Sequence, residues 1–132
     1  MRIKLISETA FTHEGDFSYL IAQIDLANKI GAEYIKFQVL LDIDSVYSKS
    51  TDLYKDMKSK TFNSEDWKNA LKYAKSLGLK TLALPIDYKA LQFSIDCNYT
   101  DAIEIHSICL NDILYLNSIN KSKTKLLIVL GV

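Results

Sequence analysis

The sequence lacks several features that mark whole classes of protein. Lys+Arg and Asp+Glu are equal at 16 each, so the 132-residue chain has no basic excess with which to attract a polyanion. We therefore expect no nucleic-acid partner. Its apolar runs are also far shorter than the roughly 20 residues that cross a bilayer, and its first residues do not form a signal peptide. These features predict a cytoplasmic protein that does not contact a membrane.

Cysteine and glycine are scarce as well. The two cysteines, Cys97 and Cys109, match no metal-ligand or redox spacing, which predicts reduced, small core residues. The four glycines stand alone in the sequence, at Gly15, Gly31, Gly78 and Gly131. The chain therefore has no glycine-rich fingerprint for binding phosphate.

What the sequence does have is a regular alternation of short apolar runs and longer amphipathic ones, which predicts repeated strand–helix units. The predicted strands are residues 3–7, 33–39, 79–84, 102–107 and 125–131, and the predicted helices are 16–30, 64–77, 88–96 and 112–119. Residues 40–62 separate the second strand from the next clear helix. A segment of this length, carrying Tyr47 and Tyr54, is either a cover over a site or a surface excursion.

Strands joined by helices of this length imply a parallel sheet. Two architectures use such a sheet. A flavodoxin-like open sheet needs five strands, whereas a (β/α)8 barrel needs eight strands and about 250 residues. Chain length alone therefore favours the open sheet.

Short motifs along the whole chain resemble those of the sialic acid synthase family, the N-acetylneuraminate synthases and their relatives in nonulosonate and spore-coat polysaccharide synthesis. Residues 8–15, ETAFTHEG, resemble the family's E-I-G-x-N-H-x-G, and residues 31–38, GAEYIKFQ, resemble G-A-D-A-V-K-F-Q. Weaker likenesses lie at 62–67, 82–87 and 103–107. The resemblance implies an incomplete TIM barrel of about five (β/α) repeats, and so reverses the expectation from length.

The resemblance also implies a domain organisation. Residues 1–132 would form a single partial barrel domain, without the small antifreeze-like C-terminal domain that family members commonly carry. Five strands of a barrel leave two unpaired edges, so we expect a homo-oligomer or association through the open edges.

The family condenses phosphoenolpyruvate with the open-chain aldehyde of an N-acyl amino sugar, such as N-acetylmannosamine, to give a nine-carbon keto acid. By resemblance, this chain would be part of such a C–C bond-forming transferase of carbohydrate biosynthesis. A divalent metal, manganese or magnesium, polarises the aldehyde in the family. Its histidine ligands come from later strands, so the resemblance implies no metal ligand in this chain.

Five residues are candidates for the site. Glu8, at the end of the first strand, takes the catalytic role by resemblance, although a carboxylate there can also cap the next helix. Lys36 is costly to bury in an apolar strand unless it faces an anion, and Gln38 points to the same side. His13 and Ser107 are further substrate-binding candidates, each with an alternative structural role in a turn.

Two positions depart from the family pattern. Glu104 stands where the family has a lysine. Its carboxylate would repel a bound phosphate by on the order of 1 to 4 kcal/mol at 4 Å. Leu84 replaces a hydroxyl-bearing residue. An alternative function therefore stands beside the enzyme: a non-catalytic, degenerate or truncated barrel that binds a sugar or a protein partner.

Overall fold

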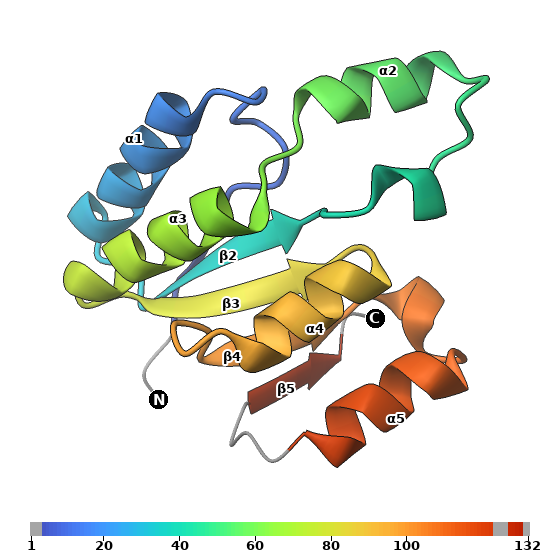
Figure 1. Cartoon of the computed structure of the whole chain (residues 1–132). Helices are drawn as coiled ribbons and strands as arrows, with labels where there is room; N and C mark the ends of the chain where they lie inside the picture. Colours follow the sequence, from blue (N-terminus) through green and yellow to red (C-terminus); the bar gives the residue numbers. More distant parts are fainter. Residues whose placement is uncertain (1–3, 123–126, 131–132) are drawn as a thin grey trace.

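Five parallel strands form one sheet in the computed structural model, which describes residues 4–122 and 127–130 (Figure 1). The strands are β1 (Ile6–Glu8), β2 (Tyr34–Val39), β3 (Lys80–Pro85), β4 (Ala102–Ile105) and β5 (Leu127–Leu130). The helices are α1 (Phe17–Lys29), α2 (Asp52–Ser59), α3 (Ser64–Ser76), α4 (Tyr88–Asp96) and α5 (Ile113–Lys121), with short 3-10 helices η1 (Ile43–Ser45) and η2 (Ser107–Cys109).

The strand order is sequential, β1-β2-β3-β4-β5, and every pairing is parallel. A flavodoxin-like sheet has the order 2-1-3-4-5, because its chain reverses direction and places helices on both faces. A barrel instead adds each strand beside the previous one. The partial (β/α) barrel is therefore confirmed, and the expectation from chain length alone is wrong.

The two faces of β2 have different surroundings. Ile35, Phe37 and Val39 are fully buried and belong to one core cluster with Trp67 and Leu71 of α3. The intervening residues of β2 are half-buried on the opposite face of the sheet. In a barrel that second face is the interior, where the side chains of neighbouring strands meet.

The segment between β2 and α3 has more structure than the sequence predicted. Residues 40–62 contain η1 and α2, and Thr51 Oγ1 caps α2 by accepting the Tyr54 backbone N–H at 3.2 Å. Tyr54 and Met57, three residues apart, form the buried side of this helix. A Thr-Asp start with this apolar spacing was the signal for α2 in the sequence.

The ends of the sheet differ slightly from the predicted ranges. β1 begins at Ile6, later than predicted, and includes Glu8 as its last residue. Of the predicted fifth strand, residues 125, 126 and 131 lie outside the described residues. β1 and β5 are the edges of the described sheet, and the exposed side chains of Leu5 and Ile6 lie beside β1's edge. Association through these edges stays a prediction.

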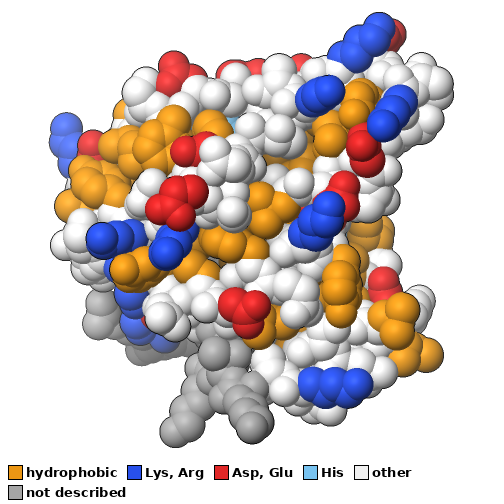
Figure 2. Space-filling view, in the orientation of Figure 1, with side chains coloured by type: hydrophobic (Ala, Val, Ile, Leu, Met, Phe, Trp, Pro, Cys, Tyr) orange, Lys and Arg blue, Asp and Glu red, His pale blue; other side chains and the backbone are white. Residues whose placement is uncertain are grey.

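The helical face of the molecule carries lysines and acids mixed with apolar patches (Figure 2). No extended patch of one charge is visible on that face, in keeping with the balanced composition. Within residues 4–122 and 127–130, no helix has the length and apolar character to cross a membrane.

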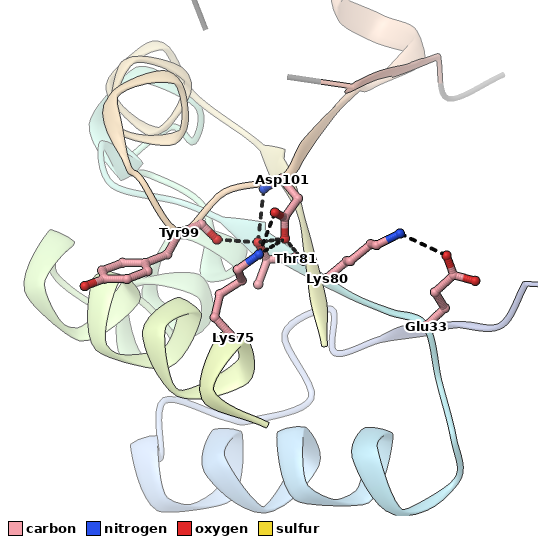
Figure 3. Close-up of polar contacts among 6 residues, drawn as sticks. All are labelled: Glu33, Lys75, Lys80, Thr81, Tyr99 and Asp101. Carbon is pink, nitrogen blue, oxygen red and sulfur yellow. Dashed lines mark hydrogen bonds and ion pairs between the residues drawn. The ribbon is translucent and has the colours of Figure 1, made fainter. Parts of the chain in front are cut away.

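A polar network joins α3, β3 and the segment before β4, near the N-terminal ends of the strands (Figure 3). We call Lys75, Thr81, Tyr99 and Asp101 the lower network. Asp101 accepts the Thr81 backbone N–H at 2.8 Å and both its oxygens contact Lys75 Nζ, at 2.6 and 2.9 Å. The Thr81 hydroxyl donates to the Tyr99 carbonyl. Burial raises the Asp101 pKa, but Lys75 and Thr81 outweigh it, and the pKa lies below its usual value.

Candidate functional site

Four polar side chains meet on the inner face of the sheet, toward the C-terminal ends of the strands. They are Glu8 of β1, Lys36 and Gln38 of β2, and Glu104 of β4, which we call the upper cluster. Glu8 and Lys36 are paired in register, so they point to the same face. Three of the five residues predicted for the site, Glu8, Lys36 and Gln38, are therefore brought together.

Lys36 is the centre of the upper cluster. Its Nζ lies 3.1 and 3.0 Å from Oε1 and Oε2 of Glu104, and 3.3 Å from Oε2 of Glu8. The Gln38 Nε2 donates to the other Glu8 oxygen, Oε1, at 3.0 Å. The Glu8 carboxylate therefore connects the charged pair to the amide.

Burial and charge distinguish the members of this cluster. The side chains of Lys36 and Glu104 are each 14% exposed, whereas that of Glu8 is 40% exposed. Burial lowers the Lys36 pKa, but hydrogen bonds and attraction from Glu104 and Glu8 outweigh this, and the pKa lies above its usual value. Lys36 is therefore charged at neutral pH, and the three ionised groups sum to −1.

The Lys36–Glu104 pair spans a whole strand. β3 lies between β2 and β4, and its inner-face residues Leu82 and Leu84 are registered beside Lys36 and Gln38. Sequence reasoning treated Glu104 only as a source of repulsion and missed this pairing. Strand alternation gives the relative faces of residues within one strand but not the order of the strands, so it did not indicate that the long lysine stem crosses β3 to reach Glu104.

A cleft of about 350 Å³ opens beside the upper cluster. It is lined by Phe11, Gln38, Val46, Tyr47, Pro85, Ile86, His106, Ile108 and Cys109. Most of this lining is apolar, and Val46 and Tyr47 come from the 40–62 segment, which thus forms one wall of the cleft. Tyr54 has a different place: its hydroxyl donates to Asp44 Oδ1 at 2.7 Å.

A larger depression, of about 490 Å³, lies elsewhere, among residues of α3 and of α4 and the turn after it. Its lining consists of Lys68, Phe93, Asp96, Cys97, Asn98 and Tyr99. None of the predicted site residues borders it. The cleft beside the upper cluster is therefore the better candidate for a substrate.

His13 lies in an aromatic cluster instead of the upper cluster. Its ring is fully buried, 4.7 Å from the Phe62 ring and 6.0 Å from that of Trp67, measured between centroids. The Gly15 backbone N–H donates to His13 Nδ1 at 3.1 Å, so the neutral ring carries its proton on Nε2. Burial lowers the His13 pKa, with Glu14 opposing this effect. The geometry gives His13 a structural place in the turn.

The turn formed by residues 8–15 contains left-handed backbone conformations that favour glycine. Gly15 has a φ of 78°, and a Cβ there would lie 2.0 Å from the Ser59 carbonyl oxygen, so no side chain fits. Ala10 has a φ of 46°, in the left-handed region, at the position where the family motif has glycine. This conformation costs a non-glycine residue about 1 to 2 kcal/mol. Ala10 thus adopts a backbone conformation that favours glycine.

The remaining predicted residue, Ser107, lies apart from the upper cluster at the exposed start of η2. His106 caps η2, its Nδ1 accepting the Ile108 backbone N–H at 3.3 Å. Both Ile108 and His106 line the cleft. Ser107 is therefore on a rim segment of the cleft, without contact to Lys36.

Asp87 is a residue whose importance sequence reasoning missed. Its Oδ2 accepts the backbone N–H groups of Leu41 and Asp42, at 2.7 and 3.1 Å, and its Oδ1 caps α4 through Ala90 N–H at 2.9 Å. One buried carboxylate thus fixes the start of the 40–62 segment against the start of α4. The Pro-x-Asp turn after β3 was the available signal.

The upper cluster does not have the donor set of a metal site. Among residues 4–122 and 127–130, no three His, Cys, Asp or Glu side chains are grouped so as to hold a metal ion. Glu8 and Glu104 come close only through Lys36, whose ammonium group takes the position of a cation between them. These four residues therefore do not fit a divalent metal by themselves, and the resemblance places the family's metal ligands on later strands.

A sequential parallel sheet with polar side chains at the carboxyl ends of its strands belongs to the class of (β/α)8-barrel proteins. The chain belongs to the NeuB family, whose model matches residues 23–132. A solved N-acetylneuraminic acid synthetase from Leptospira borgpetersenii is similar in fold, with a TM-score of 0.86 and 20% identity over 98% of this chain.

Two further proteins are similar over part of their length. A spore coat polysaccharide biosynthesis protein E from Chromobacterium violaceum has a TM-score of 0.80 and 19% identity over 98% of this chain. An uncharacterized protein of Methanocaldococcus jannaschii is 31% identical over 85 residues, which are 64% of this chain and 25% of that protein. The chain spans 44% of the Leptospira protein and 40% of the Chromobacterium protein. It thus corresponds to less than half of each.

Proposed function

We propose that this chain supplies the phosphoenolpyruvate-binding part of a sialic acid synthase-type site. Such an enzyme condenses phosphoenolpyruvate with an N-acyl amino sugar, for example N-acetylmannosamine, to a nine-carbon keto acid for carbohydrate biosynthesis. The observation that carries the proposal is Lys36, a desolvated cation on the inner face beside the C-terminal ends of the strands. Membership of the NeuB family supports the class of reaction.

Each candidate residue has a part in this proposal. The Lys36 ammonium holds an anionic group of phosphoenolpyruvate, and the half-exposed Glu8 carboxylate stabilises cationic character or positions water at the attacked enol carbon. Gln38 fixes Glu8 through its 3.0 Å hydrogen bond. Ser107 offers a hydroxyl to the phosphate from the rim. His13 contributes indirectly, by holding the turn that follows Glu8.

The alternative, a non-catalytic relative that binds a sugar or a protein, is favoured by one observation. The Lys36 ammonium already contacts three carboxylate oxygens, and the cleft beside it is lined mainly by apolar side chains. A neutral sugar could occupy such a cleft without displacing Glu104. A cytoplasmic location goes with either function and remains a prediction.

Calorimetric titration of the chain separates these functions, after circular dichroism has shown that it is folded. We expect weak phosphoenolpyruvate binding, with and without manganese, that Lys36→Ala abolishes. Lys80→Ala is the matched control, because Lys80 is also a strand lysine paired with a glutamate, Glu33 at 3.2 Å, but lies at the other end of the sheet. Binding of N-acetylmannosamine without any phosphoenolpyruvate binding would replace the synthase proposal with the alternative.

A further inference from the structure

The Lys36 ammonium group already contacts carboxylate oxygens of two glutamates. A lysine ammonium has three N–H donors and no acceptor. Its three nearby acceptors are Glu104 Oε1, Glu104 Oε2 and Glu8 Oε2, at 3.1, 3.0 and 3.3 Å. An anion that approaches Lys36 therefore competes with these carboxylate oxygens for the ammonium group.

We propose that Glu104 is a specificity-determining residue, whose carboxylate occupies the anion-binding position of Lys36 and selects against anionic ligands. The inference rests on the proposed function in taking Lys36 as the anion-binding group. It adds that, in the cluster as it stands, an anion binds Lys36 only where Glu104 is displaced or neutralised.

Glu104 fits this role better than Glu8 does. It provides both of its oxygens to Lys36, and at 14% side-chain exposure it is much less hydrated than Glu8 at 40%. Glu8 gives Lys36 a single oxygen and uses the other for Gln38. Charge–charge interactions weaken with hydration, so Glu104 has the stronger hold on Lys36 and the stronger repulsion toward an incoming anion.

The charge balance leads to the same conclusion. Glu8, Lys36 and Glu104 together carry −1 at neutral pH, so an anion entering this cluster meets net repulsion. Glu104→Gln changes this sum to zero. A neutral amide oxygen is also a weaker acceptor from Lys36 than a carboxylate, so the ammonium exchanges it more readily for a ligand.

The test is calorimetric titration of wild type and Glu104→Gln with phosphoenolpyruvate and, separately, with inorganic phosphate, at one ionic strength. We expect Glu104→Gln to bind phosphoenolpyruvate at least about tenfold more tightly than wild type does. Glu33→Gln is the matched control, because it removes the same charge from a lysine-paired glutamate that directly precedes β2, at the N-terminal ends of the strands. It should leave anion affinity unchanged. Lys36→Met added to Glu104→Gln should abolish the gain.

Equal affinity of wild type and Glu104→Gln for both anions would overturn the inference, as would a gain that survives Lys36→Met or that Glu33→Gln reproduces. If Glu104→Gln does not fold, Glu104→Asp replaces it, since it keeps the charge but withdraws the carboxylate by one methylene. A smaller gain, about threefold, is then expected, and no gain would contradict the inference.

The two anions separate this inference from the synthase proposal. A gain for inorganic phosphate and phosphoenolpyruvate alike, with no preference between them, supports Glu104 as the selective residue and removes phosphoenolpyruvate as the particular ligand. Tight phosphoenolpyruvate binding by wild type that Glu104→Gln does not improve has the opposite meaning. It supports the synthase site and overturns the role of Glu104.

Discussion

Charged side chains are held differently at the two ends of the strands: the lower network lies at the N-terminal (lower) end and the upper cluster toward the C-terminal (upper) end. In the lower network, Asp101 is fixed by the Thr81 backbone N–H as well as by Lys75. In the upper cluster, Glu8, Lys36 and Glu104 are held by one another's side chains. A carboxylate bound to the backbone cannot move without breaking the fold, whereas one bound to a lysine can exchange it for another partner. The carboxylate of the lower network is therefore tied to the main chain, whereas the contacts of the upper cluster that we describe join side chains to side chains.

The Lys36–Glu104 pair is also less exposed than the Lys75–Asp101 pair. Lys36 and Glu104 are each 14% exposed, while the side chains of Lys75 and Asp101 are 35% and 31% exposed. Desolvated pairs interact more strongly and lose more when one partner is removed. The upper cluster thus combines a strong internal pair with the freedom to rearrange.

The largest loss of stability is expected at Gly15, where the turn after β1 leaves no space for a side chain. Gly15→Ala places a Cβ 2.0 Å from the Ser59 carbonyl oxygen and strains a φ of 78°, so we expect a loss of about 3 kcal/mol or more in the free energy of unfolding. Gly78→Ala is the matched control at the lower end: its φ is 86°, but its Cβ meets nothing within 4 Å. Urea denaturation should show about 1 to 2 kcal/mol for that variant. Equal losses would refute the close contact.

Removing the central carboxylate of the lower network comes next. Asp101→Ala leaves the Thr81 N–H and the Lys75 ammonium without their acceptor, so we expect a loss of about 2 to 3 kcal/mol. Urea denaturation measures it. The control is Asp96→Ala, an exposed acid at the end of α4, which should stay within about 0.5 kcal/mol of wild type. An equally small loss for Asp101→Ala would mean that the lower network contributes little to the free energy of unfolding.

A pair of double-mutant cycles compares the two ends directly. For Lys36→Met and Glu104→Gln we expect a coupling of about 1 to 2 kcal/mol, because the pair is desolvated. For Lys75→Met and Asp101→Asn we expect about 0.5 to 1 kcal/mol, since water screens that pair and the backbone N–H provides much of Asp101's effect. Both cycles use unfolding free energies from urea titrations. A larger coupling at the lower end would reverse the comparison.

Sequence periodicity predicted most of this fold because it reports burial directly. The alternation in β2 and the spacing in α3 place apolar side chains on the helical side, and the structure buries them there. α2, which buries Tyr54 and Met57, was missed because residues 40–62 were interpreted as one connection between the second strand and the next clear helix. Chain length and periodicity did not indicate the barrel type of sheet, and only the motif resemblance did so.

The candidate site was predicted in part. Strand alternation was enough to group Lys36 with Gln38, and the position of Glu8 at the end of its strand brought it to the same place. The pairing of Lys36 with Glu104 depends on the order of the strands. Lys36 reaches Glu104 because only one strand, β3, separates their strands. Strand order is a property of the tertiary fold, and local sequence patterns do not contain it.

The smallest effect is the pH dependence of stability that His13 contributes from the 8–15 turn. Burial lowers the folded-state pKa of His13 below its ordinary value near 6.5, so the unfolded chain binds a proton more readily than the folded one. Its contribution to stability is therefore complete above about pH 6.5 and is lost as the pH falls through the folded pKa. We expect a lower thermal midpoint at pH 5 than at pH 7, measured by circular dichroism.

Two variants test whether His13 causes this dependence. His13→Asn keeps an acceptor for the Gly15 N–H but cannot titrate, so the difference between pH 5 and pH 7 should shrink even if the variant is less stable overall. His106→Asn, on the wall of the cleft, should keep the wild-type difference. If His106→Asn removes the pH dependence of the thermal midpoint and His13→Asn does not, the group responsible lies at the cleft and not in the buried turn.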